Sequence, residues 1–319
     1  MVSASVIVCT HNRAHLLRRA LEPAASQARE CGAEVLVVDN ASTDDTPTVV
    51  GALARDLAPT LRTAHEPRLG LSAARNCGLA HARGALAVFL DDDAVPRPGW
   101  LPALLAPFAA PGIVCVGGRI LLEFFVPPPP WLTPPLHPAL SAFDLGDEPR
   151  RVPERPGDPY PYGGNIALRT ATVHALGGFA TRMGLRGASG LQQEETDLCW
   201  RIDRSGGEIH YAPDAVVDHW VFPERLLPEW FFARFALFGK SNAVFDIKNR
   251  GLNRALGLLR WHYVPRLSLR RYRPAASVDA DRLLAECRRR EALGYLRGLA
   301  AGIPRLPALR RERVLSVAS

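Results

Sequence analysis

The chain has 319 residues, of which 47% are apolar and 22% charged, a globular composition that excludes disordered and collagen-like classes. At roughly 150 residues per domain, this length suggests about two domains or one large α/β domain with extensions. The net charge of +7 is unevenly distributed, because residues 1–220 hold 19 Lys/Arg against 24 Asp/Glu, whereas residues 221–319 hold 20 against 8. The mildly acidic body argues against nucleic acid as a partner, and the basic C-terminal third favours anionic partners such as a membrane surface.

The cysteines and the hydropathy predict where the protein works. The six cysteines are far apart and show no CxxC pair or Cys/His spacing, so neither a zinc site nor a disulfide framework is indicated. The first apolar run follows no charged leader, and no apolar stretch reaches the roughly eighteen residues that span a bilayer. We therefore expect a cytoplasmic protein, either soluble or peripheral on the inner face of the cell membrane.

Strand and helix patterns alternate in the N-terminal part of the chain, as in a doubly wound α/β sheet. Short runs rich in β-branched residues predict buried strands at 5–9, 34–38 and 86–90. Helical patterns lie between these strands, one at about 14–29 after the first strand and two at about 44–57 and 71–83 after the second.

Polar residues follow each predicted strand. Thr10 and Asn12 follow the first strand, Asp39 follows the second, and the run Asp91-Asp92-Asp93 follows the third. Ligands of such sheets bind beyond the carboxyl ends of the strands. We therefore expect these three groups to meet at one rim.

The pattern changes in the middle of the chain. Residues 127–161 hold 12 of the 28 prolines, which predicts an inserted loop, either a plain surface loop or an ordered lid beside the site. Further elements are expected as helices at 170–176 and 194–205, short strands at 208–212 and 215–217, and helical structure from Glu224 onward.

Two acidic groups carry the chemistry. The adjacent carboxylates Asp91, Asp92 and Asp93 repel one another unless a cation lies among them, and hard oxygen ligands favour Mn²⁺ or Mg²⁺. Glu194 and Glu195 begin a predicted helix, where the helix dipole favours carboxylates. Because a helical step of about 100° separates them, at most one points squarely into a cleft.

Eight motifs in order resemble those of family 2 glycosyltransferases with the GT-A fold, over about residues 3–222. They are VIVCTHNRAHLLRRAL, EVLVVDNASTDDT, RLGLSAARNCGLAHARG, AVFLDDDAVP, GGNIALR, GGF, QEETDLCWRI and AVVDHW. The resemblance implies an α/β catalytic domain over 1–222, with a Rossmann-like mixed sheet flanked by helices and the proline-rich loop 127–161. A basic, mainly helical extension is expected over 223–319.

The resemblance also implies roles for individual residues. Nucleotide contacts are implied for Thr10, Asn12, Asp39, Arg68, Asn76, Asp91 and Asp92, with Arg75 as a further candidate near the base and ribose. A metal site is implied for Asp91, Asp93 and His219, and contacts with the donor sugar and acceptor for Gly164 and Asn165. Glu195 matches the second acid of the family's Glu-Asp motif, which is the usual general base. Because Glu stands there in place of Asp, the assignment between Glu194 and Glu195 stays open.

The activity implied is inverting, metal-dependent transfer of a sugar from a nucleotide-diphosphate sugar to an acceptor hydroxyl. The acceptor would be a saccharide or lipid-linked molecule in the synthesis of cell-surface polysaccharide, glycolipid or a related glycoconjugate. One alternative, a sugar-phosphate nucleotidyltransferase, would have a glycine-rich loop after the first strand, whereas the first glycine is Gly32. The other, a non-catalytic nucleotide-sugar binder, would lack one of the carboxylate sites.

An aromatic stretch opens the C-terminal third. Its members, close to Arg234 and Lys240, are Trp230, Phe231, Phe232, Phe235 and Phe238. Two interpretations remain open, a helix packed within the protein or an interfacial helix with its aromatics at the headgroups of an anionic membrane.

Overall fold

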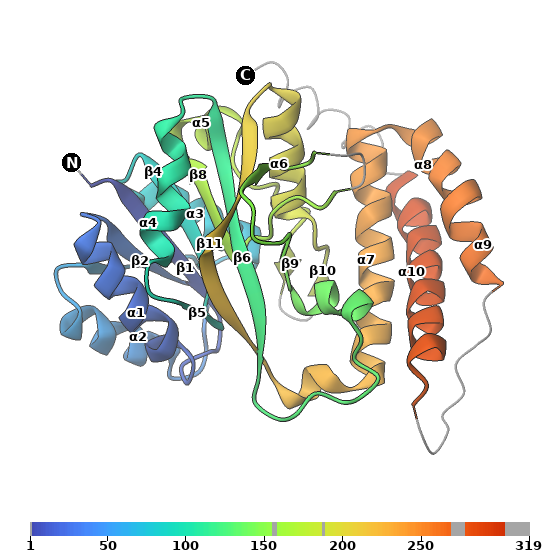
Figure 1. The fold of residues 1–319 in the computed structure, drawn as a ribbon, viewed down its shortest axis with the longest axis horizontal. Helices are drawn as coiled ribbons and strands as arrows, with labels where there is room; N and C mark the ends of the chain where they lie inside the picture. Colours follow the sequence, from blue (N-terminus) through green and yellow to red (C-terminus); the bar gives the residue numbers. More distant parts are fainter. Residues whose placement is uncertain (1, 155–157, 187–188, 269–277, 304–319) are drawn as a thin grey trace. The chain divides into compact units, whose positions relative to one another are not determined.

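The computed structural model describes residues 2–154, 158–186, 189–268 and 278–303. The chain forms two compact units (Figure 1). Unit 1 comprises Met1–Leu121, Ser141–Gly190 and Glu194–Trp220, and unit 2 comprises Leu122–Leu140, Leu191–Gln193 and Val221–Ser319. Unit 2 thus draws on three separate stretches of the chain, of which only the last corresponds to the predicted extension from residue 223.

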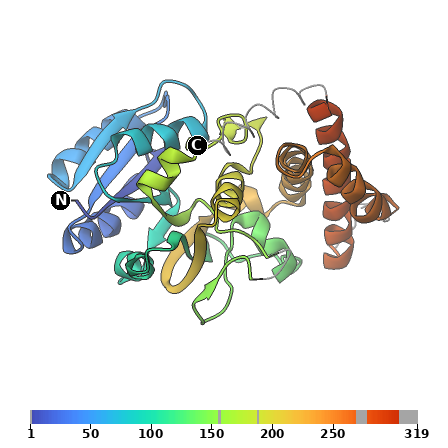
Figure 2. The ribbon, with the colours of Figure 1, turned by 90° about the horizontal axis from the view of Figure 1, so that it is seen from above.

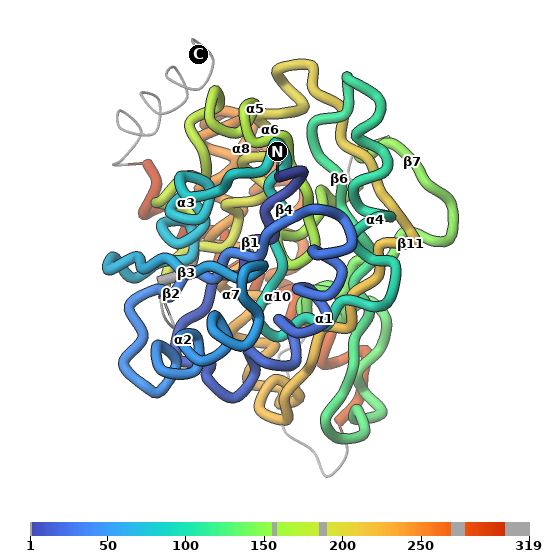
Figure 3. Tube along the Cα trace, turned by 90° about the vertical axis from the view of Figure 1, so that its left-hand side faces the viewer, coloured from blue at the N-terminus to red at the C-terminus, as the bar shows by residue number. Residues whose placement is uncertain are grey.

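Unit 1 is built on a mixed sheet flanked by helices, which confirms the predicted fold class. The strand order is β3-β2-β1-β4-β8-β6-β11-β5, with β7 paired to β11. The succession from β3 through β2 and β1 to β4 can be followed in Figure 3. The strands of this sheet are β1 (Ala4–Thr10), β2 (Glu34–Asp39), β3 (Leu61–His65), β4 (Leu86–Asp91), β5 (Ala94–Pro96), β6 (Ile113–Phe124), β7 (Arg150–Arg151), β8 (Asn165–Arg169) and β11 (Glu208–Val221). A separate two-stranded sheet joins β9 (Leu185–Arg186) and β10 (Ser189–Gly190).

Helices cover both faces of this sheet (Figure 2). They are α1 (Leu17–Glu30), α2 (Thr46–Asp56), α3 (Leu71–His81), α4 (Trp100–Leu105), the 3-10 helix η1 (Ala106–Ala109), α5 (Thr170–Ala175) and α6 (Glu194–Arg204). Side chains alternate along a strand, so Val6 of β1 joins the core with α1, α2 and α4, whereas Ile7 joins the core with α3, α5 and α6.

Strand direction positions the site. β1 pairs in parallel with both β2 and β4, so Thr10 lies opposite Asp39 and Cys9 lies opposite Asp91. The carboxyl ends of these strands therefore meet at one rim, as predicted. β8 enters antiparallel to β4, with Asn165 opposite Leu90, which brings the preceding Gly164 to the same rim.

Two local predictions need correction. The two short strands expected at 208–212 and 215–217 form one strand, β11, because Pro213 and Asp214 continue the extended backbone. A proline is compatible with a strand wherever the ladder needs no N–H from it. The proline-rich segment 127–161 is not a single loop, since its part up to Leu140 belongs to unit 2 and its part from Ser141 belongs to unit 1.

Unit 2 is helical. Its elements are the 3-10 helices η2 (Pro134–Leu140) and η3 (Pro223–Leu226), the helices α7 (Pro228–Asn249), α8 (Leu252–Leu258), α9 (Val264–Leu267) and α10 (Ala280–Gly302), and the π-helical turn η4 (Leu259–Tyr263). α7 and α10 lie side by side (Figure 1). They run parallel, because Ala236 lies beside Gly294 and, further along both helices, Ile247 lies beside Gly302.

The aromatic stretch of α7 is packed within unit 2. Phe231 is fully buried, and its ring meets that of Trp131 edge-on at 5.4 Å between centroids. Trp230, Phe232, Phe235 and Phe238 are partly buried against the same cluster. This supports the interpretation of α7 as a packed helix over that of an interfacial helix.

Glycines allow α7 and α10 to approach closely, which gives a first testable prediction. A Cβ on Gly294 would collide with the carbonyl oxygen of Ala236, whereas a Cβ on Gly257 of α8 would meet no atom within 4 Å. We expect Gly294→Ala to lower the free energy of unfolding by about 1–3 kcal/mol through overpacking. Gly257→Ala should raise it by about 0.5 kcal/mol through helix propensity. Urea unfolding of both variants checks this, and equal shifts would contradict it.

No helix among the described residues is long and apolar enough to cross a bilayer.

Candidate active site

Three side chains at the rim form a group suited to a metal ion. Asp91, Asp93 and His219 each offer one ligand atom, and these atoms all lie within 4.8 Å of one another. His219 reaches the group because β11 pairs antiparallel with β5, which places it opposite Ala94, the neighbour of Asp93. The structure therefore brings together the three residues for which sequence resemblance implied a metal site.

The surroundings of this group fit a divalent cation. His219 Nε2 lies 3.2 Å from Asp93 Oδ1, and its other ring nitrogen, Nδ1, is buried without a hydrogen-bond partner in the described part of the chain. Burial raises the pKa of Asp91, and the negative charge of Asp93 adds to this, although the Arg75 guanidinium opposes it. The half-buried carboxylate of Asp91, the buried carboxylate of Asp93 and an imidazole form a donor set that accepts Mn²⁺ or Mg²⁺, and a cation would relieve the repulsion.

Asp92 makes different contacts from its two neighbours. Thr10 Oγ1 donates a hydrogen bond to Asp92 Oδ2 at 2.7 Å. Burial, followed by the charge of Asp93, raises the pKa of Asp92 to about 7. Arg13 NH1 lies 3.4 Å from Asp93 Oδ2, which adds a positive charge at this edge of the group. Asp92 and Thr10, both predicted to contact the nucleotide, are thus joined directly.

Arg75 connects the start of α6 to the group of Asp91, Asp93 and His219, which we call the metal-competent group. The Arg75 side chain is only 4% exposed, and its guanidinium lies 3.7 Å from Asp91 Oδ1. It donates a 2.7 Å hydrogen bond to Glu194 Oε1 and lies 3.8 Å from Glu195 Oε2. Sequence reasoning placed Arg75 near the base and ribose, whereas the structure places it among the carboxylates of both acidic groups.

The structure distinguishes the two glutamates that the sequence left open. The Glu194 side chain is 4% exposed and bonded to Arg75, whereas the Glu195 side chain is 20% exposed. Burial, followed by the charge of Glu195, raises the pKa of Glu194 to about 8, and Arg75 opposes this rise. Of the two, Glu195 is therefore the carboxylate that a substrate can reach.

Two glycines let the backbone come close to this cluster. A Cβ on Gly163 would collide with the guanidinium of Arg75, and a Cβ on Gly164 would lie 2.7 Å from Asp91 Oδ2. Gly164 is therefore beside Asp91, in the region where resemblance implied the donor sugar. The absence of a side chain here is what makes room for Arg75 and Asp91.

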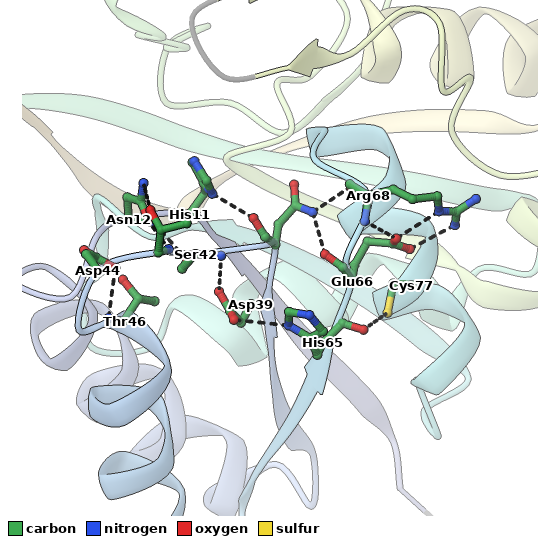
Figure 4. A network of polar contacts seen from close by, with 12 residues as sticks. His11, Asn12, Asp39, Ser42, Asp44, Thr46, His65, Glu66, Arg68 and Cys77 are labelled. Atoms are coloured by element: carbon green, nitrogen blue, oxygen red, sulfur yellow. Dashed lines mark hydrogen bonds and ion pairs between the residues drawn. The ribbon is translucent and has the colours of Figure 1, made fainter.

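A network of polar contacts lies at the ends of β1, β2 and β3 (Figure 4). Asp39 Oδ2 lies 3.2 Å from His65 Nδ1, and its Oδ1 accepts a hydrogen bond from the backbone N–H of Ser42. Asn12, with a positive φ of 53°, accepts a hydrogen bond from the Thr43 N–H through its side-chain oxygen. Asp39 and Asn12 are thus held by neighbouring loops, and His65 is a member of the site that the sequence analysis missed.

Arg68 is exposed and folds back on its own loop. Its Nε and its backbone N–H both donate to Glu66 Oε1 at 2.9 Å, and the hydrogen bond from Arg68 NH2 reaches Glu66 Oε2 at the same distance. The loop itself is fastened by Asn40, whose amide donates to the carbonyl oxygens of Glu66 and Arg68. Arg68 therefore lies at the Asp39 side of the rim, already paired with a carboxylate.

Two predicted contact residues have structural partners instead. Asn76 uses both ends of its amide on the backbone of Phe179, donating to the carbonyl oxygen and accepting from the N–H, each at 2.8 Å. Asn165 is fully buried, accepts a hydrogen bond from Trp100 Nε1, and donates to the carbonyl oxygens of Arg119 and Ala215. These geometries do not support the predicted contacts of either side chain with nucleotide or sugar.

The bonds of Asn165 lead to a second prediction. Asn165→Ala should lower the free energy of unfolding by about 3 kcal/mol, because it leaves the indole N–H of Trp100 and two carbonyl groups buried without partners. Asn253→Ala, at an exposed position of α8, serves as the control and should change it by less than about 0.5 kcal/mol. Thermal unfolding measures both, and an unchanged stability together with a raised KM for the donor would restore the predicted role in sugar binding.

Arg75 and His65 show which signals the sequence lacks. Arg75 bonds a residue 119 positions away, and no local pattern marks that pairing. His65 ends β3, a strand in which only Leu61 is buried and which has no apolar run to reveal it. Only the parallel pairing of β2 with β3 places His65 opposite Asp39.

Comparison with known proteins finds relatives of this chain. Residues 5–172 match the family model described as Glycosyl transferase family 2. A pre-mycofactocin glycosyltransferase of Mycobacterium tuberculosis is 32% identical over 250 residues, covering 77% of this chain and 48% of that protein. A glucosyl-dolichyl phosphate glucuronosyltransferase of Haloferax volcanii is 26% identical over 253 residues, covering 77% and 78%. The chain thus spans about half the length of the mycobacterial relative.

Solved structures share the fold. The mannosyltransferase PcManGT from Pyrobaculum calidifontis, in complex with GDP-Man and Mn²⁺, aligns with a TM-score of 0.55 at 20% identity, over 99% of this chain and 85% of that one. GalNAc-T7 with UDP, GalNAc and Mn²⁺ aligns with a TM-score of 0.56 at 17% identity, over 78% and 50%. At these identities the likeness shows a common fold.

Proposed function

The chain belongs to glycosyl transferase family 2, and from this premise we propose that it transfers a sugar from a nucleotide-diphosphate sugar to an acceptor hydroxyl. The observation that carries the proposal is the arrangement around Arg75. This guanidinium lies between Asp91 of the metal-competent group and Glu195, the accessible carboxylate of α6. Such a transfer needs a metal site for the diphosphate and, in the same site, a carboxylate that can act as a general base.

The donor would bind along the rim. Asp39, supported by His65, and Thr10, bonded to Asp92, lie at the ends of adjacent strands and offer polar groups to a nucleotide. Two proteins with this fold, GalNAc-T7 and PcManGT, bind UDP or GDP-Man together with Mn²⁺, which supports a nucleotide donor and a divalent cation. Asp91, Asp93 and His219 would hold Mn²⁺ or Mg²⁺, and such a cation neutralises the charge that develops on a leaving diphosphate.

Glu195 is the proposed general base. The acceptor oxygen forms its bond to the anomeric carbon while the bond from that carbon to the diphosphate oxygen breaks, and the electron pair leaves with the diphosphate. The proton of the acceptor hydroxyl passes to the Glu195 carboxylate. Attack from the face opposite the leaving group inverts the anomeric centre, which NMR of the product's anomeric proton measures.

We extend the proposal to the acceptor and the location. The acceptor would be a saccharide or a lipid-linked saccharide used in building cell-surface polysaccharide, glycolipid or a related glycoconjugate. The reaction would take place in the cytoplasm, at the inner face of the cell membrane. Two observations support this extension. The Haloferax relative is a glucosyl-dolichyl phosphate glucuronosyltransferase, and basic residues are in excess after residue 220 of this chain.

A donor panel tests the proposed function. The purified chain is incubated with Mn²⁺ or Mg²⁺ and each of a set of nucleotide sugars, and release of the nucleotide diphosphate is measured. We expect hydrolysis of one donor, its loss with EDTA and its return with added metal. Thermal protection by a nucleotide without release of product from any donor, with or without acceptor saccharides, would instead indicate a non-catalytic binder.

A further inference from the structure

Unit 2 exposes three large apolar side chains on the short segment that follows α7. Trp261 is 75% exposed, and Leu256 and Val264 on the same short segment are 44% and 47% exposed. We call these three residues, together with Arg254 and Arg260, the Trp261 surface. Three of its five members are large apolar side chains that folding has not buried.

The opposite side of this segment is firmly packed. Ala255 and Tyr263 are buried, and the ring of Tyr263 stacks on that of Tyr295 of α10 with 3.9 Å between centroids. Leu256 lies in α8, Trp261 in the π-helical turn that follows it and Val264 at the start of α9, so all three exposed side chains belong to one short helical segment. The segment is therefore an amphipathic element fixed to α10 on its inner side, with the Trp261 surface on its outer side.

The charge around the surface is positive. Between Asp246 and Asp279 the sequence contains eight Lys/Arg and no acidic residue. Arg266 and Arg250 are neutralised by Glu291 and Asp246 within unit 2, so we leave them out. Arg254 and Arg260 have no ion-pair partner anywhere in the described ranges.

Arg260 and Trp261 form a cation–π contact. The guanidinium carbon of Arg260 lies 4.9 Å from the centroid of the Trp261 ring. Tryptophan side chains favour the headgroup level of a bilayer, and amphipathic helices with basic residues bind there. The Trp261 surface has both features, and the other side of its segment is held by α10. The apolar side chains enter the acyl boundary, and the arginines meet anionic headgroups.

We propose that the Trp261 surface docks the protein onto a bilayer that carries anionic lipids. The inference deepens the membrane location proposed above by naming the residues that make the contact, and it replaces the aromatic stretch of α7, which is packed within unit 2. Lipid is favoured over a protein partner because the surface combines a few exposed apolar side chains with two arginines that form no ion pair among the described residues, and because the nearest acidic residue along the chain, Asp246, is buried and paired with Arg250.

Flotation of the full chain with vesicles tests the proposal. We expect binding to phosphatidylglycerol vesicles and little binding to phosphatidylcholine vesicles. Trp261→Ala should weaken binding by roughly tenfold through the lost apolar contact. Arg254→Gln with Arg260→Gln should weaken it by roughly twenty-five-fold, because each arginine near an anionic surface contributes roughly fivefold.

Matched controls separate this surface from general effects. Leu227→Ala removes another exposed apolar side chain of unit 2, and Arg18→Gln with Arg29→Gln in α1 makes the same change in net charge. Both controls should bind as the unchanged chain does. Equal loss in the arginine control would assign binding to net charge and overturn the proposal, as would binding that Trp261→Ala leaves unaltered.

Two further outcomes keep this inference distinct from the proposed function. A dimer that sediments without lipid and dissociates in Trp261→Ala would identify a second copy of the chain as the occupant and reject the lipid proposal. Absence of vesicle binding combined with normal donor hydrolysis would reject the surface alone. Vesicle binding without hydrolysis of any donor would leave the surface standing and reject the proposed function.

Discussion

Replacement of Glu195 by Gln should lower the turnover number by about 10²–10⁴-fold, because an amide of the same shape cannot accept the proton of the acceptor hydroxyl. Glu195 is the more exposed of the two glutamates and lies 3.8 Å from Arg75, so the change leaves the bond between Arg75 and Glu194 in place. Single-turnover release of the nucleotide diphosphate measures the effect. Thermal protection by the nucleotide should be unchanged, since among the described residues Glu195 is paired with Arg75 and not with Asp39, His65 or Asn12.

Glu194→Gln is the matched control for this prediction. It keeps the shape of a buried side chain and removes the carboxyl group whose pKa burial and Glu195 raise to about 8. We expect a smaller loss of turnover than for Glu195→Gln and the disappearance of a titration near that pH. A larger loss in Glu194→Gln would assign the base to Glu194, and a loss below about tenfold in both variants would contradict a glutamate base altogether.

Arg75→Met should lower the free energy of unfolding by about 3–5 kcal/mol, because it removes one partner of a buried ion pair and leaves Glu194 in the core without a counter-charge. Without the guanidinium, the pKa of Glu194 rises further above its value in the unfolded chain. In the unchanged chain the pKa of Glu194 is already raised to about 8, so both folded forms hold this proton at lower pH, and only the unchanged chain gains an ionised Glu194 beside Arg75 as the pH passes 8. The loss should therefore be larger at about pH 9 than at about pH 6.

Two comparisons make the Arg75 prediction specific, with urea unfolding as the measurement. Arg18→Met removes an exposed arginine that pairs with Glu22 and Asp56, and it should cost less than about 1 kcal/mol. Arg75→Lys keeps the charge but not the planar fork, so its stability should lie between those of the unchanged chain and Arg75→Met. A loss for Arg75→Met no larger than that for Arg18→Met would contradict the role of the buried pair.

Local sequence was sufficient for the elements with strong patterns. The apolar runs of β1, β2 and β4 predicted buried strands because their side chains are covered on both faces of the sheet. β3 escaped prediction because its sequence, LRTAH, leaves alternate side chains exposed at the edge of the sheet. The division of the proline-rich segment between two units was also invisible, since it depends on contacts with residues far along the chain.

The site residues divide in the same way. Asp91, Asp93 and His219 could be proposed as one metal site because they lie in motifs that resemble those of a known family. In the structure, strand pairing brings their ligand atoms within 4.8 Å of one another. Asn165 matched a motif equally well, yet its side chain is buried against Trp100. A motif identifies the position of a residue along the chain, whereas the direction of its side chain depends on its neighbours in space.

The sequence by itself determined the family, the alternation of strands and helices, and the rim at which the polar residues gather, because periodicity and turn chemistry are local properties. Only the tertiary structure decided which glutamate is accessible, which charges Arg75 joins, and that Trp261 is exposed whereas Phe231 is buried. The physical reason is that burial and ion pairing depend on atoms that packing brings together from distant parts of the chain.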